Sequence, residues 1–398
     1  MEEQSLFSEK EMGFITLEEV FEAYFACRKH KRGTYNAMRF ELDYEEGCYD
    51  LWQDINNGTY RIGRSIVFVV DKPVKREIFA ADFRDRVVHH LIAKKILPLL
   101  EGEFIEDSYA TRPGKGTLYG IRRIEQMIRE CSDNYTRDCY IMKLDVQSFF
   151  MNIRKQTLYD LISDFLLQRY KGNDINMLLW LLRLVIFNNP VERCIVRSPR
   201  EKWTGMPKNK SLFGTDGTHG LPIGNLTSQL LALLYLNSID HKITEEWGVA
   251  HYGRYVDDMV LVVRDRQKLL AAKRILGCRL GTLGLRLHPR KVYLQHYAKG
   301  VQFVGGMVLP GRKYVSRRVT GNIFHAIYRF NEMAATDDSS VTTHTEEMMR
   351  TMNSYFGMLK HFNSYRLTHK IIGRIDQRWF RSMYIQRTKG NYRVVKKN

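Results

Sequence analysis

The sequence of 398 residues lacks several features that mark common protein classes. Its six cysteines are widely spaced and form no C-x-x-C pair, which argues against a disulfide framework and against a structural zinc site. No apolar run approaches the length of a membrane span, and the acidic start Met1-Glu2-Glu3 is not a signal peptide. We therefore expect a cytoplasmic protein that does not enter a membrane.

Acidic residues are also scarce relative to basic ones. The chain has 44 Asp and Glu against 62 Lys and Arg, so its net charge is +18 and its pI is about 9.5. The basic charge of a protein of this size indicates a polyanionic partner, and we expect nucleic acid as that partner rather than an anionic membrane. No internal repeat or low-complexity tract is present, and 44% hydrophobic residues indicate a globular protein with room for two or three packed subdomains.

The stretch Tyr255-Val256-Asp257-Asp258 organises the rest of the sequence. An apolar strand, 259–263, follows it, so the pattern predicts a β-hairpin with two adjacent aspartates at its tip. Burying adjacent carboxylates costs several kcal/mol unless a cation compensates, and Mg²⁺ prefers such oxygen ligands. Aspartate is also common in ordinary turns, and these four residues alone do not separate the two interpretations.

A third aspartate favours the metal interpretation. Residues 140–146 form a short apolar strand that carries Asp145 at its end, where a carboxylate suits a metal better than a core. Three carboxylates can hold two Mg²⁺ ions about 3.5–4 Å apart, the arrangement used for in-line phosphoryl displacement.

Three other segments carry basic, aromatic or glycine-rich patterns. Residues 60–80 have strand character with interleaved basic and aromatic side chains, which suit a surface that follows a nucleic-acid strand. A helix is expected over 87–100, ending at Pro98. Glycine and proline in 220–229 precede an apolar helix, and a tight glycine turn there would let backbone approach a nucleotide. From Arg312 onward we expect three helices, whose Met348 and Met352 serve packing.

Taken in chain order, residues 60 to 310 resemble reverse transcriptases of bacterial retroelements. Tyr255-Val256-Asp257-Asp258 matches the YxDD box of that family, and Leu144-Asp145 with Phe149-Phe150 resembles its first palm metal motif. Segments 108–116, 284–291 and 303–305 are similar to the fingers motif, the lysine-bearing motif and the primer-grip strand.

One departure from the common family pattern narrows the resemblance. Where most retroelement polymerases have Gln-Gly and Ser-Pro, this chain has Ile223-Gly224 and Ser228-Gln229. The string 220–229 resembles the enzymes of diversity-generating retroelements, as does 210–213. Those enzymes copy a template-repeat RNA with errors opposite adenine, and the cDNA replaces a variable region by mutagenic retrohoming. They act with a small basic accessory variability protein, an oligomeric four-helix bundle.

The resemblance implies an α+β right-hand polymerase with fingers, a palm built on an antiparallel sheet, and a helical thumb. We expect an N-terminal helical extension at 1–58, fingers at 59–140, a palm at 141–310, and a thumb with a basic tail at 311–398. Within the palm, a fingers or insert segment is expected at about 164–219. Many group II intron proteins also carry maturase, DNA-binding and endonuclease parts, and from the length of this sequence we do not expect them here. We also expect no RNase H or protease segment.

The resemblance also assigns roles to residues. Asp145, Asp257 and Asp258 are the expected catalytic residues and, with Val146, the ligands of two Mg²⁺ ions, for which Mn²⁺ would substitute. Phe150 occupies the sugar-gate position that excludes a ribose 2′-hydroxyl, whereas Phe149 is the better core candidate. The expected dNTP-binding residues are Lys72, Arg84, Phe149, Phe150, Gly224 and Lys291. Template contact and fidelity are expected at Arg112, Ile223, Ser228 and Gln229, and the primer grip at Phe303, Val304 and Gly305.

The expected partners are template RNA, the cDNA or primer strand, and dNTPs. A retron-type or defence-associated reverse transcriptase shares the palm and is the alternative among enzymes. A polymerase fold that serves as an inactive RNA-binding scaffold is the alternative outside enzymes, and the presence of all three carboxylates disfavours it.

Overall fold

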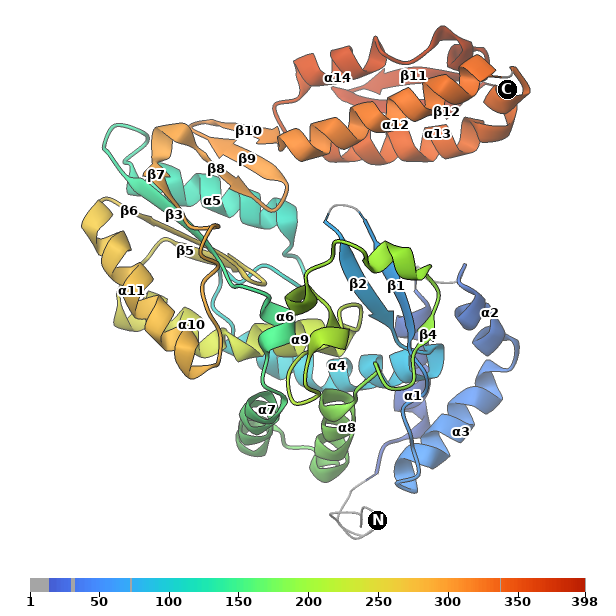
Figure 1. Ribbon diagram of the computed structural model, residues 1–398, viewed down its shortest axis with the longest axis vertical. Helices are drawn as coiled ribbons and strands as arrows, with labels where there is room; N and C mark the ends of the chain where they lie inside the picture. The colour runs from blue at the N-terminus through green and yellow to red at the C-terminus, as the bar shows by residue number, and fades with distance from the viewer. Residues whose placement is uncertain (1–13, 30–32, 72–73, 337, 398) are drawn as a thin grey trace. The chain divides into compact units, whose positions relative to one another are not determined.

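A computed structural model describes residues 14–29, 33–71, 74–336 and 338–397. The chain divides into two compact units, each assembled from three stretches. The first comprises Met1–Arg112, Asp145–Gly248 and Leu270–Lys291, and the second Pro113–Leu144, Val249–Leu269 and Val292–Asn398. Helices and antiparallel strands occur in both (Figure 1), so the predicted α+β class is confirmed. None of the described helices combines the length and the apolar composition needed to cross a bilayer.

The first unit is built around two apolar helices that pack on each other, α4 (Phe83–Glu103) and α9 (Leu226–Tyr235). Pro98 lies inside α4 and does not end it, because Ile96 and Leu100 on either side are buried and packing outweighs the lost hydrogen bond. The other helices of this unit are α1 (Leu17–Arg28), α2 (Tyr35–Leu42), α3 (Tyr44–Asn56), α6 (Phe149–Asn152), α7 (Lys155–Arg169), α8 (Ile175–Phe187) and α10 (Asn237–His241).

A small sheet completes the first unit. Its strands are β1 (Ile66–Val70), β2 (Arg76–Ala80) and β4 (Ile195–Val196), in the order β2-β1-β4. β1 and β2 lie within residues 60–80, where strand character is expected, and they pair antiparallel, while β4 pairs parallel to β1. The Phe79 amide donates to the Ile223 carbonyl at 2.9 Å, so the glycine turn before α9 lies against β2.

The sheet that carries the YVDD hairpin belongs to the second unit. Its order is β5-β6-β3-β7, with β5 (Tyr252–Tyr255), β6 (Asp258–Val263), β3 (Tyr140–Asp145) and β7 (Tyr293–His296). Residues 259–262 are all buried, and α5 (Thr117–Cys131) packs against β5 and β6. The hairpin and the strand that ends on Asp145 are both confirmed. After β6 the chain continues into α11 (Arg266–Thr282).

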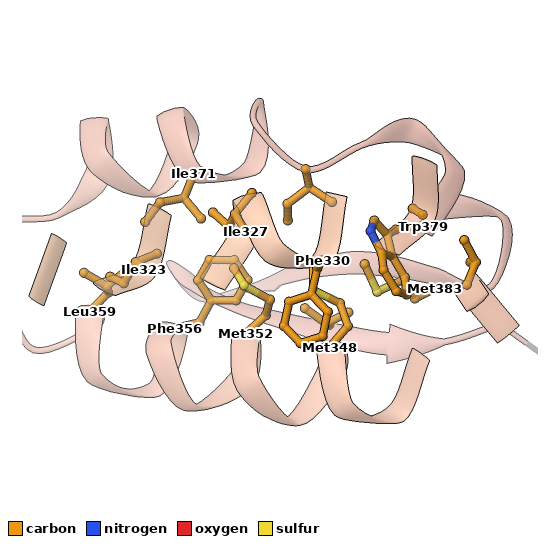
Figure 2. Close-up of a cluster of buried hydrophobic side chains, with 14 of the residues drawn as sticks. Ile323, Ile327, Phe330, Met348, Met352, Phe356, Leu359, Ile371, Trp379 and Met383 are labelled. Atoms are coloured by element: carbon orange, nitrogen blue, oxygen red, sulfur yellow. The ribbon is translucent and has the colours of Figure 1, made fainter. Parts of the chain in front are cut away.

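Beyond this sheet, three short strands and a C-terminal helical part follow. The strands β8 (Val301–Phe303), β9 (Gly306–Leu309) and β10 (Arg312–Val315) form an antiparallel meander. The helices α12 (Arg317–Thr336), α13 (Asp338–Leu359) and α14 (Tyr365–Ile372) bury one apolar core (Figure 2). Met348 and Met352 are fully buried in it, which confirms that they serve packing.

The C-terminal tail forms a β-hairpin that the sequence analysis did not predict. Strands β11 (Met383–Thr388) and β12 (Asn391–Lys396) pair antiparallel, and β12 packs against α13. The two turn residues, Lys389 and Gly390, both have positive φ, as in a type I′ hairpin turn. Met383 and Val394 are buried, so the tail is part of the core and not only a basic extension.

Candidate active site

The hairpin tip has a strained backbone. Tyr255 pairs with Asp258, so Val256 and Asp257 alone make the turn. Val256 has φ of 56°, a left-handed conformation that costs a β-branched residue about 1–3 kcal/mol. Strain of this kind persists only where the surroundings enforce it, and it concentrates at functional sites. Burial also raises the pKa of the Tyr255 phenol above its ordinary value.

A buried arginine donates a hydrogen bond to the backbone of this turn. Arg254 lies on β5 with 0% of its surface exposed, and its Nη1 donates to the Val256 carbonyl oxygen at 2.9 Å. An arginine is almost never fully buried unless its donors are satisfied. The bond fixes the orientation of the peptide unit that joins Val256 to Asp257, and thereby the direction in which the aspartate leaves the turn.

Asp258 is held by a lysine from the neighbouring strand. Lys143 Nζ lies 2.9 Å from Asp258 Oδ1, and β3 and β6 are adjacent in the sheet. Because side chains alternate along a strand, Lys143 and Asp145 leave β3 on the same face.

Asp145 is held in a similar way by the segment that the sequence analysis identified as lysine-bearing. Lys291 Nζ lies 2.8 Å from Asp145 Oδ2, and the His288 amide donates to the Asp145 carbonyl at 2.8 Å. Val146, which is buried, forms an antiparallel bridge with Leu287. Residues 286–291 therefore run beside the end of β3, and Lys291 reaches a carboxylate where the sequence predicted a phosphate contact.

Carboxylate oxygens are the ligands that Mg²⁺ prefers, so the donor atoms of the three aspartates fit that ion. Across the described residues, however, no three His, Cys, Asp or Glu side chains are gathered closely enough to hold a metal ion. The assignment of Asp145, Asp257 and Asp258 to metal binding therefore stays a prediction. Asp145 and Asp258 each face a lysine, whose ammonium group supplies the positive charge there.

The two adjacent phenylalanines after Asp145 lie in different surroundings. Phe149 is 2% exposed and packs edge-to-face on Phe150, with ring centroids 5.5 Å apart. Phe150 is partly exposed and packs on a small apolar cluster that includes Val67 and Phe79. Ile223 packs on the same cluster, so the expected sugar gate and the expected fidelity residue share one apolar support.

The residues of the glycine turn are placed by β2 and α9. Gly224 has φ of 129°, and a Cβ there would lie 3.0 Å from the Phe79 carbonyl oxygen, so only glycine fits. The close backbone approach is thus to β2. Ser228 is buried in α9, whereas Gln229 is exposed and accepts a hydrogen bond from Thr111 at 3.1 Å.

Three basic residues expected to contact nucleotide or template have different environments. Arg112 is buried and donates to Glu101 and to the Ile105 and Ser108 carbonyls, so the protein itself holds its guanidinium and does not offer it to a template. Arg84 is paired with Asp54 and lies over the Tyr60 ring at 5.4 Å. Lys72 lies outside the described residues.

The segment expected to grip the primer is a second strained turn. Phe303 ends β8 and is fully buried, and Val304 and Gly305 follow with φ of 37° and 92°. The Gly305 carbonyl accepts the Ser316 amide at 2.9 Å, which ties the turn to the start of α12. Val304 is thus a second β-branched residue held in the left-handed region.

Sequence reasoning missed Lys143 and Arg254. Each is the one basic residue of a short strand beside a carboxylate motif, and the other residues of that strand are mainly apolar or aromatic. That pattern could have indicated these two residues, because a charged side chain is buried in a strand only where a partner compensates its charge.

Comparison with known proteins found one matching family and similar chains. Residues 72–308 match the family described as reverse transcriptase (RNA-dependent DNA polymerase). The protein YkfC of Escherichia coli K12 is 24% identical over 274 residues, which cover 60% of this chain and 65% of that protein, less than two thirds of its length. A solved structure of apo telomerase from Candida tropicalis, truncated from its C-terminal domain, aligns with a TM-score of 0.44 at 12% identity, covering 64% of this chain and 55% of that one.

The matched region spans more than half of the chain and contains Asp145, the YVDD hairpin, Lys291 and the strained turn at Val304. This chain belongs to the reverse transcriptase (RNA-dependent DNA polymerase) family.

Proposed function

We propose that this protein is an RNA-directed DNA polymerase whose active site is built on the β5–β6 hairpin. The observation that carries the proposal is the tip itself, where two adjacent aspartates follow a valine held at φ of 56° by a buried arginine. A turn without a function would place glycine or asparagine at that position, because neither residue bears the strain.

The three aspartates would hold two Mg²⁺ ions during catalysis. Lys143 and Asp145 share one face of β3, and Lys143 reaches Asp258, which supports a common face for Asp145 and Asp258. When bound, such ions lower the pKa of the primer 3′-hydroxyl and neutralise the triphosphate and the leaving pyrophosphate. Lys143 and Lys291 would then release the carboxylates, which leaves their ammonium groups available to phosphate oxygens.

Substrate selection would rest on Phe150. Its ring is partly exposed and is supported by the apolar cluster beneath it, so it presents a rigid edge to the incoming sugar. A bulky ring at this position would exclude a ribose 2′-hydroxyl and select dNTPs. Phe149 is buried and would contribute packing, not contact with the nucleotide.

Primer extension on a homopolymer RNA template with Mg²⁺ tests the proposal. Wild type should incorporate dNTPs. In Asp257→Asn the rate of incorporation should fall by several orders of magnitude, because the substitution removes negative charge from the reacting centre. Asp265→Asn is the matched control, since Asp265 is exposed and only caps α11 through the Gln267 amide. Equal incorporation by wild type and Asp257→Asn would reject the assignment and favour an RNA-binding scaffold.

We further propose that the enzyme serves a diversity-generating retroelement, copying a template-repeat RNA with errors at adenine for mutagenic retrohoming. The support is the sequence of the glycine turn together with the position of Ile223, whose apolar side chain shares a support with Phe150. Where a glutamine would hydrogen-bond near the nascent pair, isoleucine offers no polar group, which would loosen discrimination there. Sequencing of cDNA should show that Ile223→Gln lowers the error rate at template adenines relative to other bases, and an unchanged rate would count against this role.

The proposed partners follow from this function. Template RNA, the primer or cDNA strand and dNTPs would bind the enzyme, and a small basic accessory protein of four-helix-bundle subunits would join it. Because this chain carries a net charge of +18, a basic partner would need an anion between them. We therefore expect the template RNA to hold the two proteins together, so that ribonuclease treatment separates them.

A further inference from the structure

The C-terminal part of the second unit contains an open pocket of about 680 Å³. Strand β10, the end of α13, the start of α14 and the β11–β12 turn form it. Its volume falls in the range of small-ligand sites, which suits one or two nucleotides. None of its lining residues belongs to the proposed active site.

The pocket is positively charged. Arg312, Lys360 and Arg366 line it, and no Asp or Glu does. Within the part of the chain that the structure describes, none of these three side chains forms an ion pair, and all three are exposed. The surrounding sequence 311–398 holds seventeen Lys and Arg against six Asp and Glu, so it contributes +11 of the total +18. An anionic ligand is therefore favoured.

The pocket is also lined with aromatic rings. Tyr365 is 62% exposed at the start of α14, and its ring lies 4.2 Å from that of His369. The His369 ring in turn meets Tyr392 edge-on at 5.8 Å, and Arg387 lies over Tyr392 at 5.7 Å. An exposed ring backed by other rings is a suitable surface for stacking a nucleobase.

Tyr392 provides a second, independent observation that points to a ligand. Its hydroxyl is buried and has no hydrogen-bond partner among the described residues, although Tyr392 lines the pocket. A buried hydroxyl left unpaired costs about 1–3 kcal/mol, and a ligand that supplies a partner would recover it.

We propose that this pocket binds an unpaired nucleotide of single-stranded RNA, outside the polymerase active site. The base would stack on Tyr365, the Tyr392 hydroxyl would bond a polar group of the nucleotide, and Arg312, Lys360 and Arg366 would neutralise flanking phosphates. A duplex cannot enter, because its base faces are stacked on each other. RNA is the occupant because the chain belongs to a family that copies RNA. The inference rests on that membership and not on the type of retroelement.

Fluorescence anisotropy of the full chain with a labelled RNA of about ten unpaired nucleotides tests the proposal. Tyr365→Ala and Arg366→Ala should each weaken binding about tenfold, since loss of one stacking platform or one phosphate contact has effects of this size. The matched controls are Tyr384→Ala and Arg350→Ala, because both residues are exposed in the same region but do not line the pocket. Both should bind RNA within about twofold of wild type.

Tyr392→Phe separates a binding role from a structural one. It removes only the unpaired hydroxyl, so the free protein should unfold at the same or a higher temperature while single-stranded RNA binds about threefold to tenfold more weakly. Unchanged RNA affinity in this variant would overturn the proposal. The proposal would also be overturned if the control variants lost as much affinity for single-stranded RNA as the pocket variants. It would likewise be overturned if the pocket variants lost as much affinity for single-stranded DNA or for an RNA duplex as for single-stranded RNA. Extension of a short pre-annealed primer should not change, so a failure here is distinct from a failure of the polymerase assignment.

Discussion

Replacing Arg254 with methionine removes the group that holds the hairpin tip. The Nη1 donor lies 2.9 Å from the Val256 carbonyl, and no part of the side chain is exposed, so water does not compensate for its loss. A hydrogen bond from a charged group contributes about 1.5–3 kcal/mol, which is similar to the strain that a β-branched residue bears in the left-handed region. Without the arginine, Val256 is free to relax, and Asp257 moves with it.

The expected loss follows from that free energy. Since each 1.36 kcal/mol corresponds to a tenfold change in rate, kcat for nucleotide incorporation should fall about 10- to 150-fold in Arg254→Met. The KM for dNTP should stay nearly constant, because the groups expected to bind the nucleotide lie elsewhere. Steady-state primer extension measures both constants, and thermal unfolding of the same preparation identifies loss caused by global destabilisation.

A second substitution in the turn makes the reasoning refutable. Glycine adopts the left-handed conformation without strain, so Val256→Gly should not need the arginine to hold the turn. In the Val256→Gly background, Arg254→Met should therefore lose about tenfold less activity than it does in wild type. If the loss is the same in both backgrounds, Arg254 does not act through the strained peptide. If Arg254→Met is fully active, the turn does not depend on it.

Three further predictions concern neighbouring features. Lys143→Met frees Asp258 from its 2.9 Å ion pair and should lower the Mg²⁺ concentration at which extension is half-maximal, whereas a raised requirement would show that the lysine positions the carboxylate for the metal. Gly224→Ala places a Cβ 3.0 Å from the Phe79 carbonyl at φ of 129°, and should reduce the free energy of unfolding by about 1–3 kcal/mol; a stabilised variant would contradict this. Burial lowers the pKa of His89 to about 3 from 6.5, so the unfolded chain takes up a proton below pH 6.5 that the folded protein does not, and stability is lost as the pH falls. His89→Asn should remove about 3 kcal/mol of that loss between pH 7 and pH 4, as followed by denaturant unfolding, and parallel pH profiles would refute it.

The sequence was sufficient for features whose signal is local. The YVDD hairpin and the strand that ends on Asp145 depend on neighbouring residues, and the structure contains both of them. The sequence predicts three helices and a basic tail from Arg312 onward, so it does not predict the hairpin whose turn is Lys389 and Gly390.

Ion pairs between residues that are distant in sequence could not be predicted from local patterns. Lys143 reaches Asp258 only because β3 and β6 lie side by side, and Lys291 reaches Asp145 only because residues 286–291 return beside β3. The family resemblance predicts a template contact for Arg112, but its donors are taken by Glu101 and nearby carbonyls. In each case the fold decided which group the charged side chain contacts.

The most direct test of the account counts the metal ions that the aspartates hold. Mn²⁺ substituted for Mg²⁺ can be counted by electron paramagnetic resonance in a complex of the full chain with RNA template, primer and dNTP. Wild type and the Asp265→Asn control should each retain two Mn²⁺ ions per chain, and Asp145→Asn and Asp257→Asn should each retain fewer than two. Two ions in every variant would contradict the claim that these carboxylates form the metal site.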